Sequence, residues 1–399
     1  MTTTVQTPTG AAQTMVLNMG PQHPSTHGVL RVVLELDGET VVKARPEIGY
    51  LHTGIEKNCE ALTYSQAITL TDRIDYLAPL SNNLGYCLAV EKLLDLEVPK
   101  RAQYIRVLLT ELSRIGSHLV WLGTHALDLG ATSVMLYCFR EREEILKILE
   151  MVSGQRMMTS YFRIGGLAAE PPPGWLDRVR AFAGIFPSRV REYETLLTEN
   201  RIWQLRTVGI GVLNAADAVA MGASGPTLRA SGVAYDVRKF FPYSSYEEFE
   251  FDVPTRQEAD CYARYLVRLG EMRESLKIVR QAMEKIPPTG PVQADAPGIV
   301  PPQRERMKTE MEALIYHFKL FTEGFAPPPG EVYQRIESPR GEQGWFVASN
   351  GSAKPMRVHV RAPSFVHLQS LSKMAEGSLV ADLVACIGTI DIVLGEVDR

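Results

Sequence analysis

The stretch KRAQYIRVLLTELSRIGSHLVWLGTHALDL, residues Lys100–Leu129, decides the fold class. Apolar residues recur in it at intervals of three and four positions, which is the period of an α-helix that buries one face. This apolar face consists of Leu108, Leu112, Ile115, Leu119 and Leu122. The period predicts one long helix over the whole stretch, and Pro99 before it suits a first helical turn.

A polar stripe follows the same helix. It consists of Glu111, Arg114, His118, Trp121, His125 and Asp128. A charged stripe is commonly a solvated helix face. Two histidines and a terminal aspartate in so apolar a helix also fit a buried polar network, and the spacing alone leaves both interpretations open. Thr124 and Asp128 lie four positions apart and therefore point the same way.

Helices are predicted over most of the remaining chain. They cover Lys57–Leu96, Glu141–Ser153, Trp175–Thr198 with an interruption at Pro187, the region from a capping box at Thr255–Glu258 to about Ile286, Arg304–Thr322 and Ser370–Cys386. An Asp37-Gly38 turn between two apolar runs predicts a β-hairpin within Met15–Gly49, and strands with Gly-rich turns fit Glu331–Val360. We therefore expect a predominantly helical α+β fold with small β elements near the N- and C-termini.

The chain divides into four segments on this basis. They are a disordered lead-in at 1–14, a β-hairpin region with a turn-rich loop at 15–56, a helical body at 57–330, and a C-terminal β segment, helix and buried tail at 331–399.

Composition and charge exclude several classes of protein. Hydrophobic residues make up 45% and the formal net charge is −4, without a basic tail, so nucleic-acid binding is not indicated. No apolar run reaches the roughly 18 residues that span a bilayer. The longest candidate, Leu379–Leu394, is interrupted by Asp382, Gly388 and Asp391. The N-terminus has no signal-peptide pattern, so we expect the protein in the cytoplasm or on a membrane face.

Cofactor motifs are missing as well. The five cysteines, none with a ligand-spaced neighbour, predict buried reduced thiols and no metal site. Gly209–Asn214 has asparagine where a dinucleotide fingerprint needs its third glycine, and no phosphate-binding loop or nucleophile elbow is present. A stand-alone NAD or ATP enzyme is therefore not indicated, and any electrons arrive from outside this chain.

Two short runs contain residues that can donate protons. GPQHPSTHGVLR at Gly20–Arg31 places two histidines, His23 and His27, in a turn-rich loop. TDRIDYLAPL at Thr71–Leu80 contains Asp72, Arg73, Asp75 and Tyr76, and the helical period puts both aspartates and the tyrosine on one face. Surface histidines, a local Asp–Arg pair and a core tyrosine are the alternative interpretations.

These runs resemble the D-subunit family of the proton-pumping NADH–quinone oxidoreductase, respiratory complex I, which includes the mitochondrial 49 kDa subunit. The resemblance covers essentially all of Met15–Arg399. Its most specific pieces are GPQHPSTHGVLR, IGYLHTGIEK, DRIDY, AVEKLL, THALDLGA, SGQRMMTSYFRIGG, IESPRGE and DIVLGEVDR. The family is similar in turn to the large subunit of nickel–iron hydrogenases, which implies a helical bundle of that type.

The hydrogenase metal ligands are missing from this chain. The two cysteine pairs of those enzymes fall near Arg73–Tyr76 and on Asp391–Glu396, which contain no cysteine. A nickel–iron centre needs soft thiolate ligands, which Val393 and Glu396 cannot supply. The resemblance therefore implies that the former metal cavity is reused for a quinone.

The resemblance also implies specific site residues. The ligands of the quinone headgroup fall on His27 and Tyr76, and the partner of the histidine falls on Asp128. Further pocket positions are His23, Asp72, Arg73 and Thr124. Arg163 matches an arginine beside the terminal iron–sulfur cluster of a partner protein. Thr53 stands where mitochondrial relatives have a modified arginine, so that modification is not expected here.

Partners and location follow from the same resemblance. It implies the B subunit with its 4Fe-4S cluster, the C subunit and the membrane H subunit, in a heteromultimer on the cytoplasmic face of the cell inner membrane. Ubiquinone or menaquinone would be the substrate, this chain would hold no cofactor, and it would be inactive alone.

The residue types suit quinone reduction. A quinone takes up two electrons and two protons, so donors are needed at both carbonyl oxygens. A tyrosine and a histidine, with reference pKa values of about 10 and 6.5, can each serve, and Asp128 would fix the tautomer of His27. The alternatives are the same role in a complex fed by ferredoxin or a deazaflavin, a structural scaffold without proton donors, and a working hydrogenase.

Overall fold

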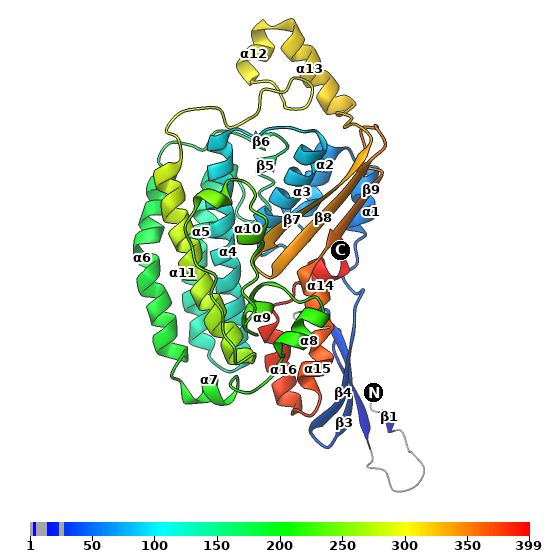
Figure 1. Cartoon of the computed structure of the whole chain (residues 1–399), viewed down its shortest axis with the longest axis vertical. Helices are drawn as coiled ribbons and strands as arrows, with labels where there is room; N and C mark the ends of the chain where they lie inside the picture. Colours follow the sequence, from blue (N-terminus) through cyan, green and yellow to red (C-terminus); the bar gives the residue numbers. More distant parts are fainter. Residues whose placement is uncertain (1–2, 5–13, 24–27) are drawn as a thin grey trace.

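The computed structural model describes residues 3–4, 14–23 and 28–399. A bundle of long helices fills one side of the molecule, and a sheet, a β-hairpin region and short C-terminal helices fill the other (Figure 1). The four long helices are α4 (Lys100–Asp128), α5 (Thr132–Ser153), α6 (Trp175–Leu197) and α11 (Cys261–Lys285). The predominantly helical α+β fold class is confirmed.

Helix α4 forms as one element, as its apolar period predicts. Both of its faces are covered, because α5 and α11 pack along it. Of its side chains, nearly all from Ala102 to Ala126 are buried, including Glu111, Arg114 and His118. The polar stripe is therefore a buried network and not a solvated face.

Helix α6 runs through Pro187 without the predicted interruption. A proline inside a helix leaves the carbonyl four residues earlier without its N–H donor. Here that carbonyl belongs to Ala183, and the guanidinium of Arg280 on α11 donates to it at 2.7 Å. The hydrogen bond from Arg280 replaces the one that the proline cannot make.

Helix α11 begins at Cys261 and not at the predicted capping box of Thr255–Glu258. Asp260 is the actual cap, since its side chain accepts from the backbone N–H of Ala263 at 2.7 Å. Ala259 just before it has a φ of 59°, which ends any helical geometry from the preceding residues.

The predicted N-terminal hairpin is confirmed. β3 (Arg31–Asp37) and β4 (Thr40–Glu47) pair antiparallel around Asp37 and Gly38, and β2 (Met15–Met19) adds to the free edge of β3. β1 (Thr3–Thr4) pairs with β2. Most of the predicted disordered lead-in at 1–14 lies outside the described residues.

The C-terminal region contains a three-stranded antiparallel sheet of β7 (Gly330–Ser338), β8 (Gly341–Ser349) and β9 (Arg357–Arg361) in that order, which confirms the strands predicted there. The preceding helix predicted at Arg304–Thr322 is two helices, α12 (Arg304–Thr309) and α13 (Met311–Thr322). Glu310 between them is extended, with φ −116° and ψ 119°.

Short elements complete the fold. They are α1 (Ile55–Ala61), α2 (Tyr64–Thr71), α3 (Pro79–Leu93), β5 (Phe162–Arg163), β6 (Gly166–Leu167), α7 (Arg201–Leu205), α8 (Ala215–Ala220), α9 (Gly225–Arg229), α10 (Val237–Phe240), η2 (Tyr246–Glu248), α14 (Pro363–Leu368), α15 (Ser370–Ala375), α16 (Val380–Thr389) and α17 (Leu394–Asp398). Within the described ranges, no helix combines the length and the apolar character that crossing a bilayer requires. All five cysteines are buried free thiols, as predicted.

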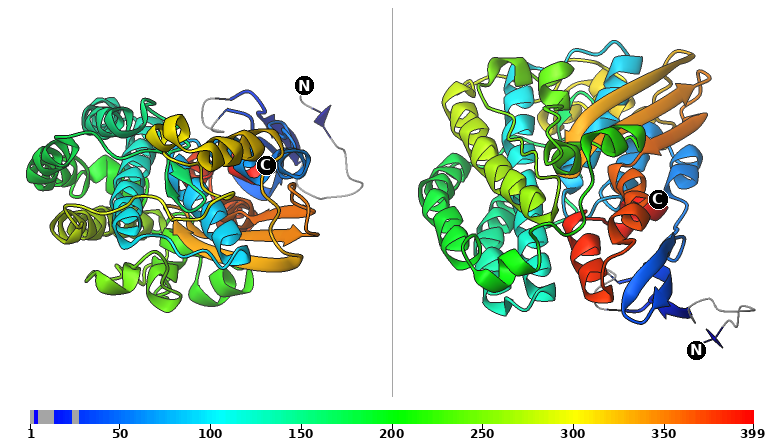
Figure 2. Two further views of the ribbon diagram at one scale, coloured as in Figure 1. Left: turned by 90° about the horizontal axis from the view of Figure 1, so that it is seen from above. Right: turned by 60° about the horizontal axis from the view of Figure 1, so that its bottom comes forward.

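Two apolar cores hold these parts together. The larger core lies within the helical body and reaches under β7–β9. The smaller core joins residues of the N-terminal hairpin, such as Leu34, to residues of the C-terminal helices, such as Leu383. The hairpin region and the C-terminal helices therefore lie side by side, as the right view of Figure 2 shows.

Candidate functional site

The segment Asp72–Ala78 is a series of turns between α2 and α3, not part of the helix predicted over Lys57–Leu96. Pro79 causes the break, because the residue before a proline avoids helical dihedral angles and Ala78 has φ −131° and ψ 57°. The carboxylate of Asp75 accepts from the backbone N–H groups of Leu77 and Ala78 at 3.1 and 3.3 Å. The predicted helical face shared by Asp72, Asp75 and Tyr76 is therefore wrong.

Asp72 ties this segment to the loop at 155–161. Its Oδ2 accepts from the N–H of Ser160 at 2.9 Å and from the hydroxyl of Ser160 at 2.7 Å, and its Oδ1 accepts from the amide of Asn83. Burial raises the pKa of this carboxyl above its usual value. Arg73 next to it is exposed and donates to the carbonyl of Thr69. Asp72 thus positions two loops.

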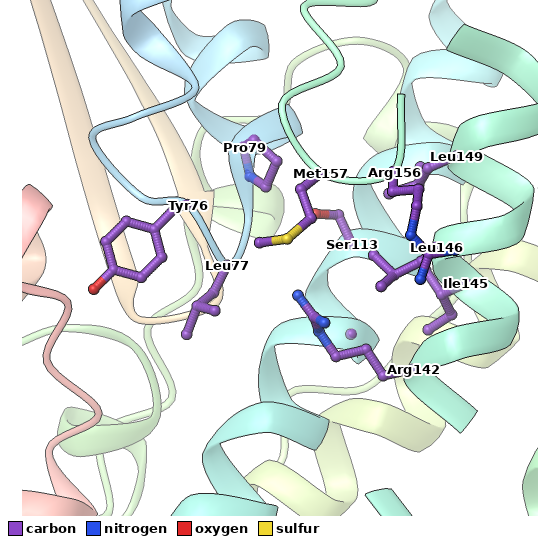
Figure 3. Close-up of a pocket in the computed structure, with 11 residues that line it drawn as sticks. Tyr76, Leu77, Pro79, Ser113, Arg142, Ile145, Leu146, Leu149, Arg156 and Met157 are labelled. Carbon is purple, nitrogen blue, oxygen red and sulfur yellow. The ribbon is translucent and has the colours of Figure 1, made fainter. Parts of the chain in front are cut away.

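Tyr76 is half-buried and rests on the C-terminal segment. A Cβ added to Gly395 of α17 would lie 2.8 Å from the carbonyl oxygen of Ile74 and 3.5 Å from the ring of Tyr76. In Figure 3 the phenol points away from Met157 and Arg142. Burial, and then Asp75, raise the pKa of Tyr76 above its usual value of 10. The phenol therefore keeps its proton near neutral pH.

A small cavity lies on the other side of Tyr76. Its lining residues come from the turn segment, the start of α3, α4, α5 and the loop at 155–161: Tyr76, Leu77, Pro79, Ser113, Gly116, Arg142, Ile145, Leu146, Leu149, Arg156 and Met157. Its volume of about 10 Å³ is room for one water molecule. A quinone ring therefore does not fit into this cavity as the described residues leave it.

A buried arginine that the sequence did not single out holds the turn segment. The guanidinium of Arg340, from the turn between β7 and β8, donates to Oδ2 of Asp75 at 2.5 Å. It also donates to the backbone carbonyl of Asp391 at 2.8 Å and approaches the Asp391 carboxylate at 3.4 Å. Asp75 therefore forms a long-range ion pair with Arg340 and not a local pair within its own segment. In the sequence, Arg340 is one charged residue in the run IESPRGE, and nothing near it indicates that Asp75 is its partner.

Three residues of the polar stripe of α4, namely Glu111, Arg114 and His118, contact buried charged side chains. Glu111 pairs with Arg114 on its own helix and with Arg238 on α10. Two turns further on, the ring of His118 lies 2.9 Å from the carboxylate of Glu271 on α11. Burial lowers the pKa of His118, so it is a neutral hydrogen-bonding group at pH 7. These contacts join α4, α10 and α11.

Among the described residues, the other predicted site positions do not line this cavity. Thr124 and Asp128 are half-buried at the end of α4, about two and three turns beyond Gly116 of the cavity. The hydroxyl of Thr124 donates to the carbonyls of Val120 and Trp121. His23 is exposed. His27 lies outside the described residues, so the structure does not test its predicted place beside Tyr76.

Arg163 is half-buried in β5. Its carbonyl accepts from Arg106 at 2.7 Å, and Arg106 forms a buried pair with Glu91 at 2.6 Å. Glu91 in turn accepts from the N–H of Gly165 at 2.8 Å. Residues of α3 and α4 thus hold the backbone of this turn in place, and this fixes the backbone position of Arg163.

Comparison with known proteins agrees with this architecture. Residues 128–399 match the family model described as respiratory-chain NADH dehydrogenase, 49 kDa subunit. The chain is 66% identical over 385 residues to the D 1 subunit of NADH-quinone oxidoreductase from Solibacter usitatus, covering 96% of this chain and 94% of the relative. It is 57% identical over 389 residues to the D subunit of NADH-quinone oxidoreductase from Geotalea uraniireducens, covering 98% and 100%.

Similarity extends over 94–100% of the length of these relatives. The D 2 subunit of NADH-quinone oxidoreductase from Koribacter versatilis adds 64% identity over 390 residues, with 98% and 97% coverage. The chain therefore belongs to the family of the 49 kDa subunit of respiratory complex I, whose bacterial members are the D subunits of NADH–quinone oxidoreductase.

Proposed function

We propose that this chain is the quinone-site subunit of its complex, and that Tyr76 and His27 donate the two protons that turn a quinone into a quinol. The observation that supports it most is the environment of Tyr76. The phenol is half-buried, keeps its proton at neutral pH, and stands on a turn held by the buried pair of Asp75 with Arg340. A fixed neutral donor is what a developing quinol oxygen needs.

His27 is proposed as the second donor, with Asp128 as its partner. A carboxylate at one ring nitrogen would set the tautomer of the imidazole and favour the imidazolium form before proton transfer. His23, Asp72, Arg73 and Thr124 are proposed to surround the headgroup. For Asp72 the structure supports an indirect contribution, since both of its oxygens are bonded within the chain.

The headgroup site needs more than this chain. The cavity at Tyr76 is too small for a quinone ring, so the pocket would be completed by residues 24–27 and by partner proteins. We propose the B subunit, with a 4Fe-4S cluster near Arg163, the C subunit and the membrane H subunit as these partners. Exposed apolar side chains on α13, namely Met311, Leu314, Ile315, Phe318 and Phe321, support contacts with other chains.

The proposal places the chain on the cytoplasmic face of the cell inner membrane, with ubiquinone or menaquinone as the substrate. Electrons would come from the NADH-oxidising part of the complex, as the names of the relatives indicate for those proteins. The residues of this chain would then orient the headgroup and supply protons, and would hold no redox group themselves.

Substitution in the assembled complex tests the donors. Tyr76→Phe and His27→Ala should each lower reduction of a short-chain quinone by about 10²-fold or more, since a positioned proton donor is worth that much. Asp128→Asn should lower turnover more than assembly. Normal assembly with near wild-type turnover in the first two variants would leave the chain as a structural scaffold.

A further inference from the structure

Three buried carboxyl groups meet behind Tyr76. Asp75 comes from the turn segment, Asp391 and Glu396 come from the C-terminal segment, and each of the three is at most 4% exposed. Two guanidinium groups accompany them. Arg340 contacts Asp75 and Asp391, and Arg268 of α11 lies over the ring of Trp121 and is close enough to Asp391 for that carboxylate to favour its charged form. We call these five residues the C-terminal acid cluster.

Glu396 is the member without a cation of its own. No ion pair joins it to a lysine or arginine in the described part of the chain. Its Oε2 accepts from the N–H of Ser364 at 3.1 Å and from the Ser364 hydroxyl, and the amide of Gln343 approaches its Oε1 at 3.4 Å. The charged groups that face it are Asp75 and Arg340. Three carboxylates against two cations would leave one uncompensated buried charge, which proteins avoid by keeping one group protonated.

Burial raises the pKa of both Asp75 and Glu396, but Asp75 is ion-paired with Arg340 and Glu396 has no such pair among the described residues, so the contacts favour Glu396 as the protonated group. Burial, and then the charge of Asp75, raise the pKa of Glu396 to about 7, although Arg340 and Ser364 act in the opposite direction. Burial lowers the pKa of Arg268 only to about 10, so both guanidinium groups stay charged at neutral pH. A neutral Glu396 makes the cluster neutral as a whole.

Glu396 directly follows a residue that packs against the proposed donor. Gly395, the residue before it, packs against the backbone of Arg73 and Ile74 and against the ring of Tyr76. Asp75 raises the pKa of both Tyr76 and Glu396, so it is close to both groups.

We propose that Glu396 stores the proton that returns to Tyr76 after the phenol has given up its own. This role rests on the proposed function of Tyr76. The O–H bond of the Glu396 carboxyl breaks, and an O–H bond forms on the phenolate oxygen of Tyr76. The negative charge moves from Tyr76 to Glu396. The direction is favourable, because the phenolate of Tyr76 is the stronger base.

Glu396→Gln in the assembled complex tests whether Glu396 supplies the proton that returns to Tyr76. The amide keeps the shape and can still accept from Ser364, but it has no proton to give. Turnover with a short-chain quinone should fall by about 10-fold or more, with KM unchanged. In the wild type, turnover should decline as the pH rises through about 7, because Glu396 then loses its proton. The variant should lack this inflection, and Glu396→Asp should restore it.

Glu337→Gln is the matched control. Glu337 is equally buried, and burial and Asp236 raise its pKa to about 7, but it contacts Arg229 and lies outside the cluster. Its variant should keep the inflection. Infrared difference spectra of the wild type should show a carboxyl C=O band that changes on quinone reduction and that Glu396→Gln removes.

Two results separate the hypotheses. In the first, Tyr76→Phe is impaired while Glu396→Gln keeps the wild-type rate, inflection and infrared band. In that case Glu396 is not the proton source for Tyr76, and Tyr76 is still the proposed donor to the quinone. If Tyr76→Phe is itself unimpaired, the proposed function is wrong, and the store falls with it.

Discussion

The guanidinium of Arg340 donates to Oδ2 of Asp75 at 2.5 Å, although the two residues are 265 positions apart in the chain. Both are buried, and Asp75 directly precedes Tyr76. The pair therefore fixes the position of the phenol relative to the C-terminal segment, which Arg340 also binds through Asp391. Tyr76 lies in a turn segment without regular secondary structure, and the pair of Asp75 with Arg340 holds that segment in place.

Replacing Arg340 with methionine should destabilise the chain strongly. The change leaves Asp75 without its cation in a buried site, and such losses cost about 3–5 kcal/mol. Urea unfolding of the purified chain measures the effect. Arg306→Met is the control, since its pair with Glu310 is exposed, and the change should stay within about 1 kcal/mol. Equal effects of the two variants would contradict a structural role for the buried pair.

Gly395→Ala should disturb the site more than the fold. The new methyl group would lie 2.8 and 2.9 Å from the carbonyl oxygens of Ile74 and Arg73, so the turn beneath Tyr76 must shift. Quinone turnover of the assembled complex should fall by about 10-fold or more, as a misplaced catalytic group predicts. Gly184→Ala in α6 meets no atom within 4 Å and should leave turnover unchanged. An unaffected Gly395→Ala complex would show that the turn tolerates displacement.

Glu111 should make the fold acid-sensitive. Burial opposes its ionisation, but Arg114 and Arg238 outweigh burial and hold its pKa at about 2. In the unfolded chain a glutamate has a pKa of about 4.3. The stabilisation is thus complete above a pH of about 4.3 and is lost as the pH falls towards 2. Urea unfolding at about pH 7 and about pH 3 should show a smaller difference for Glu111→Gln than for the wild type, and equal differences would exclude this contribution.

Asp72→Ala should loosen the loop at 155–161. The substitution removes the acceptor for both the N–H and the hydroxyl of the half-buried Ser160, and each such bond contributes about 1 kcal/mol. Hydrogen exchange at Ser160 should become faster, while exchange within α6 stays the same. Unchanged protection of Ser160 would mean that other contacts hold the loop.

Much of the fold follows from local patterns. The period of three and four residues predicts α4 correctly, and the Asp37-Gly38 turn predicts the β3–β4 hairpin, because each signal lies within one element. The break at Asp72–Ala78 was missed because apolar spacing continues through it, and only Pro79 marks the end. Pro187 predicts an interruption that α6 does not have. Arg280, which donates to the carbonyl freed by the proline, is distant in sequence and gives no local signal.

The site was less accessible to sequence reasoning. Tyr76 and Asp72 could be singled out by their neighbours, but their partners could not. Asp75 pairs with Arg340, and Glu396 bonds to Ser364, across separations that no local period encodes. The C-terminal acid cluster exists only because distant segments of the chain pack together, so its chemistry becomes visible with the fold.

The most direct test of the central claim is a structure of the assembled complex with quinone bound during turnover. The account predicts a carbonyl oxygen of the headgroup within hydrogen-bond distance, about 2.6–3.2 Å, of the Tyr76 hydroxyl. Headgroup density that stays several ångströms from both Tyr76 and His27, in a complex that is reducing quinone, would contradict it.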